Sequence, residues 1–125
     1  MAQKLVLSPL PKTWIFDLDG TLVQHNGYLT GTDTWLPGAR EFLQAIPDED
    51  YVLILTAREE RYREQTETFL QAAGVRYDAI QFGMPVGERI LLNDDKPSGL
   101  VMSQAVSLAR NQGLAELSVL IDKNK

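Results

Sequence analysis

Two aspartates end the first strongly apolar run of the sequence, in the stretch IFDLDGT at residues 15–21. Asp17 and Asp19 are two positions apart, and like charges at that spacing repel each other. Neither strand propensity nor core packing favours such a pair. We therefore expect a metal cation or a phosphorylated substrate to stabilise the arrangement.

The spacing of the two carboxylates suits phosphoryl transfer. Asp17 can attack phosphorus and form an aspartyl-phosphate intermediate. Asp19 can then act as general acid toward the leaving oxygen and as general base toward water. Gly20 lets the backbone turn close to a bound phosphate.

Two later apolar runs also end in polar residues. Thr56 is the sixth residue of the run YVLILTA at 51–57, and Asp94 and Asp95 directly follow the run RILLN at 89–93. The carboxyl ends of parallel strands lie at one edge of a sheet, where ligands bind. We therefore predict that all three strand ends meet at one site.

This predicted site would bind Mg²⁺ and a phosphate group. Mg²⁺ prefers oxygen ligands, which Asp17, the backbone near Asp19, and Asp94 or Asp95 would supply. The Thr56 hydroxyl and the amide that follows it, at Ala57, would donate to phosphoryl oxygens.

The elements that must position these residues alternate between strand and helix. Apolar runs predict strands, and apolar residues at helical spacing predict helices that end at Pro47 and at Gly74. The expected strands are residues 13–18, 51–57, 79–83 and 89–94, and the expected helices are residues 37–46 and 59–73. Residues 98–113 fit either a helix or a strand, and residues 117–122 are expected to form a last strand or helix. The run at 51–57 is continuous enough to predict cover on both faces. The alternation predicts an α/β fold with a mainly parallel sheet, in a Rossmann-like three-layer α/β/α arrangement.

Composition excludes several classes of protein. The chain has 125 residues, a net charge of −5 and no cysteine. The length predicts a single domain, 1–125, and the acidic balance argues against nucleic-acid binding. Without cysteine there are no disulfides or thiolate sites. No segment has the length of a signal peptide or membrane span, so we expect a cytoplasmic protein without membrane contact.

The motifs resemble those of the haloacid dehalogenase superfamily, most of whose members are Mg²⁺-dependent phosphohydrolases. DLDGT at 17–21 resembles the first motif, LILTAR the second and the acids of RILLNDD the fourth; PGAREFL is similar to the first helix of the family. The resemblance implies that Asp17 is the nucleophile, Asp19 the acid/base and Thr56 a phosphate ligand. It implies metal ligation by Asp17, Asp19, Asp94 and Asp95, and phosphate contacts from Gly20, Thr21, Thr56, Ala57 and Arg58.

One position departs from the family pattern. The third motif supplies a lysine, but FGMP places Met84 where that lysine is expected. Arg89 and Lys96 are the nearest cations. Lys96 is the preferred substitute, since Arg89 would begin the predicted strand at its opposite end.

Local structure offers alternatives for several of these residues. Thr56 either binds phosphate or caps the helix near Glu59. For Arg58 an ion pair with Glu59 or Glu60 is favoured over phosphate binding. Asp95 is otherwise a turn residue. Arg61 and Arg63 fit a solvated helix face, and His25 a polar loop, with substrate contact as the second interpretation of each.

Relatives in this family insert a cap domain either after the first motif or between the second and third motifs, and both segments are expected to be too short for one here. Residues 1–12 are predicted to be an N-terminal extension and 22–36 a small flap. A small substrate would then need a neighbouring subunit as a wall, so we expect a homo-oligomer with Tyr28 or Trp35 near the boundary. The substrate is expected to be a phosphorylated small molecule, with a sugar phosphate the first choice by analogy. Two further interpretations stay open: a catalytically silent member of the fold that serves in binding or assembly, and a receiver-type phospho-acceptor domain, whose acids come in a different order.

Overall fold

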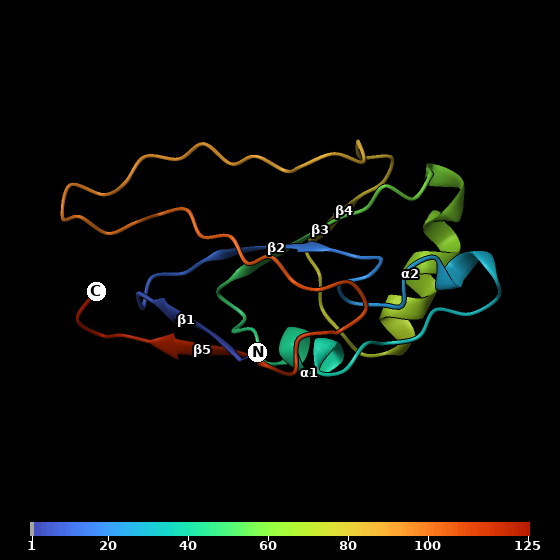
Figure 1. Cartoon of the computed structure of the whole chain (residues 1–125), viewed down its shortest axis with the longest axis horizontal. Coiled ribbons are helices and arrows are strands. Elements are labelled where there is room, and N and C mark those ends of the chain that lie inside the picture. The colour runs from blue at the N-terminus through green and yellow to red at the C-terminus, as the bar shows by residue number, and fades with distance from the viewer. Residues whose placement is uncertain (1) are drawn as a thin grey trace.

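The computed structural model describes residues 2–125, so position 1 of the predicted N-terminal extension lies outside the described part. The elements are β1 (Gln3–Leu7), β2 (Thr13–Asp17), η1 (Gly27–Leu29), α1 (Ala39–Gln44), β3 (Tyr51–Leu55), η2 (Glu60–Tyr62), α2 (Arg63–Ala72), β4 (Ala79–Gln81) and β5 (Leu117–Ile121), where η marks a short 3₁₀ helix. Strands β2, β3 and β4 form one parallel sheet with β3 in the middle, and β1 and β5 form a second parallel sheet (Figure 1). The chain is therefore α/β with parallel sheets, as predicted.

The core lies on one face of the β2-β3-β4 sheet. Val52 and Ile54 of β3 are fully buried in a cluster that includes Leu43 of α1 and Leu70 of α2. The alternate residue Tyr51 is 48% exposed, and the other outward residues of β3 are half-buried. The prediction that this strand is covered on both faces is wrong, since its residues alternate between a buried and a more exposed face.

Both helices form close to where the sequence predicts them. Pro37 and Gly38 precede α1, and the chain leaves that helix before Pro47. After α2, Gly74 has a φ of +72°, the left-handed conformation in which helices often end. Strands β2, β3 and β4 likewise lie inside the predicted ranges, and β5 confirms the strand interpretation of residues 117–122.

The N-terminal residues form a strand. Residues 3–7 pair in parallel with β5, from Gln3 opposite Leu117 to Leu7 opposite Ile121. The prediction of an extension outside the fold is therefore wrong for this stretch. The partner strand lies more than a hundred residues away in the sequence, so no local pattern announces the pairing.

The segment 22–36, predicted to be a flap, is tied to the fold at both ends. Leu22 and Leu36 are buried, and the Leu36 amide donates to the Leu22 carbonyl at 2.9 Å. The Gln24 amide donates to the Thr34 carbonyl at 2.9 Å. These bonds leave only the part around η1 as a loop over the carboxyl ends of the strands.

Residues 84–109, here called the arm, contain no helix or strand. The predicted strand at 89–94 is wrong: Ile90 is 83% exposed and Leu92 is 90% exposed. The 98–113 stretch adopts neither of its two predicted forms. Figure 1 shows the arm, yellow to orange, running from β4 past the amino end of β2 and back.

Within residues 2–125, no helix has the length and apolar character needed to cross a membrane.

Candidate active site

Asp17 stands at the carboxyl end of β2 with its side chain 40% exposed. The Thr21 hydroxyl donates to its Oδ2 at 3.2 Å, and Arg89 donates to its Oδ1 at 3.0 Å. A cleft of about 550 Å³ opens here, which we call the Asp17 cleft. Its lining is Asp17, Asp19, His25, Asn26, Tyr28, Ala57, Arg58, Val86, Gly87, Arg89 and Arg110.

The turn after Asp17 brings the second aspartate to the same cleft. Gly20 has a φ of +84°, which a residue with a side chain rarely adopts, and its amide donates to the Val23 carbonyl at 2.7 Å. The amides of Thr21 and Leu22 both donate to the Leu18 carbonyl. The structure thus places Asp17, Asp19 and Gly20 together, as the sequence predicts.

Arg58 is buried beneath the cleft, and five hydrogen bonds engage its guanidinium group. Asp19 accepts two of them at 2.9 and 3.0 Å, and Asp33 accepts two at 2.6 and 3.0 Å. The Thr66 hydroxyl of α2 accepts the fifth at 2.8 Å. Since a guanidinium has five N–H donors, none remains for a substrate.

This network corrects the interpretation of Arg58. The favoured alternative, an ion pair with Glu59 or Glu60, is wrong, because those acids pair with Arg61 and Arg63 instead. The second possibility, phosphate binding, does not fit a fully engaged side chain. Arg58 instead fixes Asp19 and joins the 22–36 segment to β3 through Asp33.

The charges in this network favour the ionised form of Arg58. Burial by itself lowers the pKa of the guanidinium, but the hydrogen bonds with Asp19 and Asp33 outweigh burial and raise that pKa above its usual value. The Tyr28 ring lies 4.0 Å from the guanidinium carbon. Burial and the Asp19 charge raise the pKa of the Tyr28 phenol, so it stays neutral.

In the turn directly after β3, Ala57 and Arg58 line the cleft and Thr56 does not. Thr56 is buried, and its hydroxyl accepts the Arg58 amide at 3.1 Å. It neither caps the helix near Glu59 nor lines the cleft. In this structure Thr56 shapes the turn that carries Arg58.

The acid pair of the arm lies elsewhere. Asp94 and Asp95 are exposed beside a turn in which the Gly99 amide donates to the Lys96 carbonyl at 2.8 Å. Asp95 accepts the Met102 amide at 3.4 Å, in keeping with its alternative as a turn residue. None of the three predicted site residues on this turn, Asp94, Asp95 and Lys96, lines the Asp17 cleft. Their predicted place at the sheet edge depended on the strand at 89–94, which is absent.

The cation beside Asp17 is Arg89 and not Lys96. Because residues 89–94 do not form a strand, Arg89 does not lie at the far end of one and reaches Asp17. Both partners of the Arg89–Asp17 pair are well exposed, so the pair itself adds little to stability.

The predicted metal ligands do not form a metal site in this structure. Among residues 2–125, no three or more histidine, cysteine, aspartate or glutamate side chains are grouped so as to hold an ion. Asp17 and Asp19 face the cleft, but guanidinium groups engage both carboxylates, and the other two acids are on the arm. As placed, these four acids do not form the Mg²⁺ site that the sequence predicts.

Several residues of this region were not predicted from the sequence. Asp33 and Thr66 complete the Arg58 network, and Arg110 lines the cleft. The amide of the neighbouring Asn111 donates to the Gly20 carbonyl at 2.9 Å. Asp33 stands in a polar loop and Arg110 before the turn-forming NQG, so local sequence gave no signal of their long-range partners.

The aromatic residues expected near a subunit boundary pack within the chain. Trp35 stacks on Phe69 of α2 with ring centres 5.2 Å apart. The Tyr28 ring meets the Tyr62 ring edge-on, with ring centres 4.8 Å apart.

Arg61 and Arg63 lie on the helix surface over the rings of Tyr62 and Phe82, as expected for a solvated face.

Comparisons with known proteins found one informative likeness. No protein-family model matches the chain, and no curated protein matches it. A solved structure of a Pnkp1/Rnl/Hen1 complex contains a chain similar to this one, with 35% identity and a TM-score of 0.51. The match covers 66% of this chain and 31% of that chain, so the present chain corresponds to less than a third of the longer one. The likeness is consistent with the α/β fold with parallel sheets.

Proposed function

We propose that this chain is a phosphohydrolase of the haloacid dehalogenase type that cleaves a phosphate monoester through an aspartyl-phosphate. One observation carries the proposal: Asp17 and Asp19 face a single cleft from a glycine turn at the carboxyl end of a parallel strand. Ligands of parallel α/β sheets bind at that edge. Asp17 is the more exposed of the two carboxylates and is therefore the nucleophile in our proposal.

The proposed reaction has two displacements at phosphorus. An oxygen of Asp17 attacks, its bond to phosphorus forms, and the bond from phosphorus to the ester oxygen breaks as Asp19 protonates that oxygen. Water then attacks the aspartyl-phosphate while Asp19 takes a proton from it. The bond between phosphorus and Asp17 breaks, which releases inorganic phosphate and restores the carboxylate.

Arg58 and Thr21 position the two acids for these steps. Arg58 contacts both oxygens of Asp19 and fixes the plane of that carboxylate. Each carboxylate oxygen keeps a second lone pair, so Asp19 can still take up and deliver a proton. The Thr21 hydroxyl holds Oδ2 of Asp17 and leaves Oδ1 toward Arg89.

The finer features predicted from the sequence are part of this proposal. The fold is proposed to have three layers and no cap domain, and the protein to be a cytoplasmic homo-oligomer. The proposed substrate is a phosphorylated small molecule, and a sugar phosphate is the first candidate. Mg²⁺ remains a predicted cofactor, and none of the steps above depends on it. A three-layer arrangement would require cover on the exposed face of β3.

A catalytically silent binding or assembly protein of the same fold is the second candidate. The observation that favours it is the engagement of both aspartates by arginines, together with the distance of the arm acids from the cleft. In such a protein the Asp17 cleft would bind an anionic partner without turnover.

Turnover of a generic ester separates the two candidates. Purified protein would be assayed with p-nitrophenyl phosphate, with and without Mg²⁺, beside Asp17→Asn and the surface control Glu64→Gln. We expect hydrolysis by the wild type and by Glu64→Gln, and loss of nearly all of it in Asp17→Asn. No hydrolysis of this ester or of a panel of sugar phosphates by the wild type would favour the silent protein.

A further inference from the structure

Arg110 is a cation of the Asp17 cleft for which the described residues supply no acid. We propose that Arg110, with Nδ1 of His25, binds the phosphoryl group of the substrate; its role in turnover rests on the proposed function, whereas the binding itself does not. No motif of the sequence assigns this role to Arg110, and substrate contact is only the second interpretation of His25 from the sequence.

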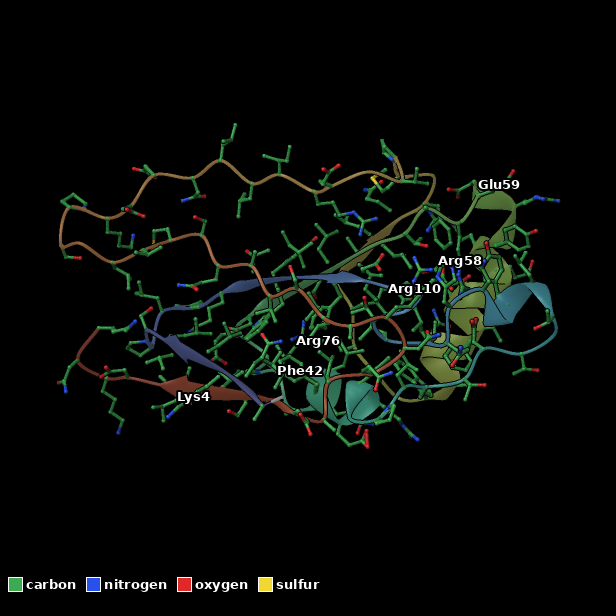
Figure 2. All side chains as sticks on the ribbon, viewed as in Figure 1. Lys4, Phe42, Arg58, Glu59, Arg76 and Arg110 are labelled. Carbon is green, nitrogen blue, oxygen red and sulfur yellow. The ribbon has the colours of Figure 1, made fainter. Side chains whose placement is uncertain are left out.

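The backbone holds Arg110 at the aspartate turn. Next to it, Asn111 donates its amide to the Gly20 carbonyl and accepts the His25 amide at its Oδ1, both at 2.9 Å. Asn111 has a φ of +65°, a left-handed conformation that asparagine tolerates better than most residues. Arg110 is therefore fixed against the turn at the point where the arm ends. Figure 2 shows it on the same side of the molecule as Arg58.

The missing side chain of Gly20 allows Arg110 and His25 to pack closely against the aspartate turn. A Cβ built at Gly20 would lie 3.7 Å from Nδ1 of His25, 3.8 Å from Nε of Arg110 and 3.2 Å from Cγ of Arg110. Both side chains line the cleft beside Asp17. The glycine therefore lets Nε of Arg110 and Nδ1 of His25 lie near the same point of the turn.

The His25 nitrogen has an unmet hydrogen-bonding requirement. Within residues 2–125, Nδ1 of His25 is a buried side-chain atom without a hydrogen-bond partner. Buried polar atoms are rarely left unpaired, and such an atom at a cleft indicates a ligand or water as its partner. A phosphoryl oxygen would accept its hydrogen bond when the proton is on Nδ1.

The charges of the cleft lead to the same conclusion. Arg58 is engaged by Asp19 and Asp33, and Arg89 by Asp17. No acid among the described residues pairs with Arg110, so an incoming anion can serve as the counter-ion of its guanidinium group in the cleft. A planar guanidinium presents parallel N–H groups that match the oxygens of a phosphate, which is why we infer a phosphoryl group.

Binding of inorganic phosphate, measured by calorimetry at fixed ionic strength, tests the proposal directly. The variants are Arg110→Met, which keeps the stem that packs on Gly20, Arg110→Lys, which keeps the charge, and His25→Phe. Arg61→Met is the matched control, because Arg61 is an exposed arginine paired with Glu59 outside the cleft. Thermal unfolding of each variant confirms that it is folded.

We expect Arg110→Met to weaken phosphate binding about tenfold or more, the effect of losing one charge-assisted hydrogen bond. Arg110→Lys should recover part of the affinity, His25→Phe should lose several-fold, and Arg61→Met should bind as the wild type does. Unchanged affinity in Arg110→Met, or no phosphate binding by the wild type, would overturn the inference.

Turnover of p-nitrophenyl phosphate by the same variants separates this inference from the proposed function. If the wild type binds phosphate through Arg110 and hydrolyses no ester, the binding site stands and the phosphohydrolase does not. If the wild type hydrolyses the ester and Arg110→Met has the same KM and phosphate affinity, the function stands and the role of Arg110 is refuted.

Discussion

At the scale of single residues, the Asp17 cleft combines residues that are neighbours in the sequence with residues that are far apart in it. Asp17, Asp19 and Gly20 lie within four consecutive positions, so their chemistry can be recognised from the sequence. The partners of Arg58 lie 39 and 25 positions away at Asp19 and Asp33. Local spacing favours Glu59 or Glu60 as the partner of Arg58. In the folded chain Arg58 is buried and pairs with the distant acids Asp19 and Asp33 instead.

Substitution of the proposed nucleophile separates chemistry from folding. Asp17 is well exposed, and its pair with Arg89 is a surface pair. Asp17→Asn should therefore change the free energy of unfolding by no more than about 0.5 kcal/mol while abolishing turnover. Urea unfolding and the ester assay on one preparation test both parts. Substantial activity in Asp17→Asn would refute a covalent role for Asp17.

Removal of Arg58 should be among the costliest substitutions in the chain. Arg58→Met leaves the carboxylate of Asp33, whose side chain is 2% exposed, buried without its counter-ion. We expect a loss of about 3–5 kcal/mol in the free energy of unfolding. Arg61→Met, in an exposed pair, should cost about 0.5 kcal/mol or less. Urea unfolding measures both.

The double variant Arg58→Met/Asp33→Asn tests the cause of that loss. If the uncompensated carboxylate causes it, neutralising Asp33 should recover part of the lost stability. Equal losses in the single and double variants would mean that Arg58 acts through packing alone.

At the scale of elements, local patterns predicted the helices and the central strands correctly. The 89–94 run was misread, because an apolar run indicates a strand only when a neighbouring strand can pair with it. In the structure this run is exposed and pairs with no neighbouring strand. Asp94 and Asp95, which follow it, therefore do not lie at the predicted site. The ends of β2 and β3 could therefore be predicted to converge, whereas the third strand end could not.

Amide hydrogen exchange decides between the predicted strand and the observed arm. Amides of residues 89–93 should exchange nearly as fast as in an unfolded chain, whereas those of Val52 and Ile54 in β3 should be strongly protected. Protection at 89–93 comparable with β3 would show that this run is a strand in solution. The prediction for Asp94 and Asp95 at the sheet edge would then be restored.

The turn that returns the chain to α1 depends on a glycine. Gly113 has a φ of +79°, and a Cβ there would lie 2.2 Å from the Pro37 carbonyl oxygen. Gly113→Ala should lower the free energy of unfolding by about 2 kcal/mol or more, because backbone strain and a steric clash add.

Gly99→Ala is the matched control, since Gly99 has a φ of +93° and no neighbour within 4 Å. It should cost only the backbone contribution of about 1 kcal/mol. Equal losses at the two positions in urea unfolding would show that contact with Pro37 does not limit the turn.

At the scale of the whole molecule, the alternation of strand and helix patterns predicted the α/β class, and long-range pairing determined the arrangement. The parallel pairing of β1 with β5 joins the first and last strands of the chain. The short apolar run that precedes Pro9 and Pro11 forms β1, and nothing in that run indicates that its partner strand is β5. The site is likewise a product of distant segments: β2, the 22–36 segment, the turn after β3, the beginning of the arm and Arg110 after the arm all contribute to the Asp17 cleft.

Chemical quenching during turnover tests the central claim of a phosphohydrolase with Asp17 as nucleophile. The wild-type protein would be mixed with a phosphate ester carrying labelled phosphorus, quenched in acid within one turnover, digested and analysed by mass spectrometry. We expect the label on the peptide that contains Asp17, and no label in Asp17→Asn. Steady hydrolysis without labelled protein, or label on any other residue, would contradict the account.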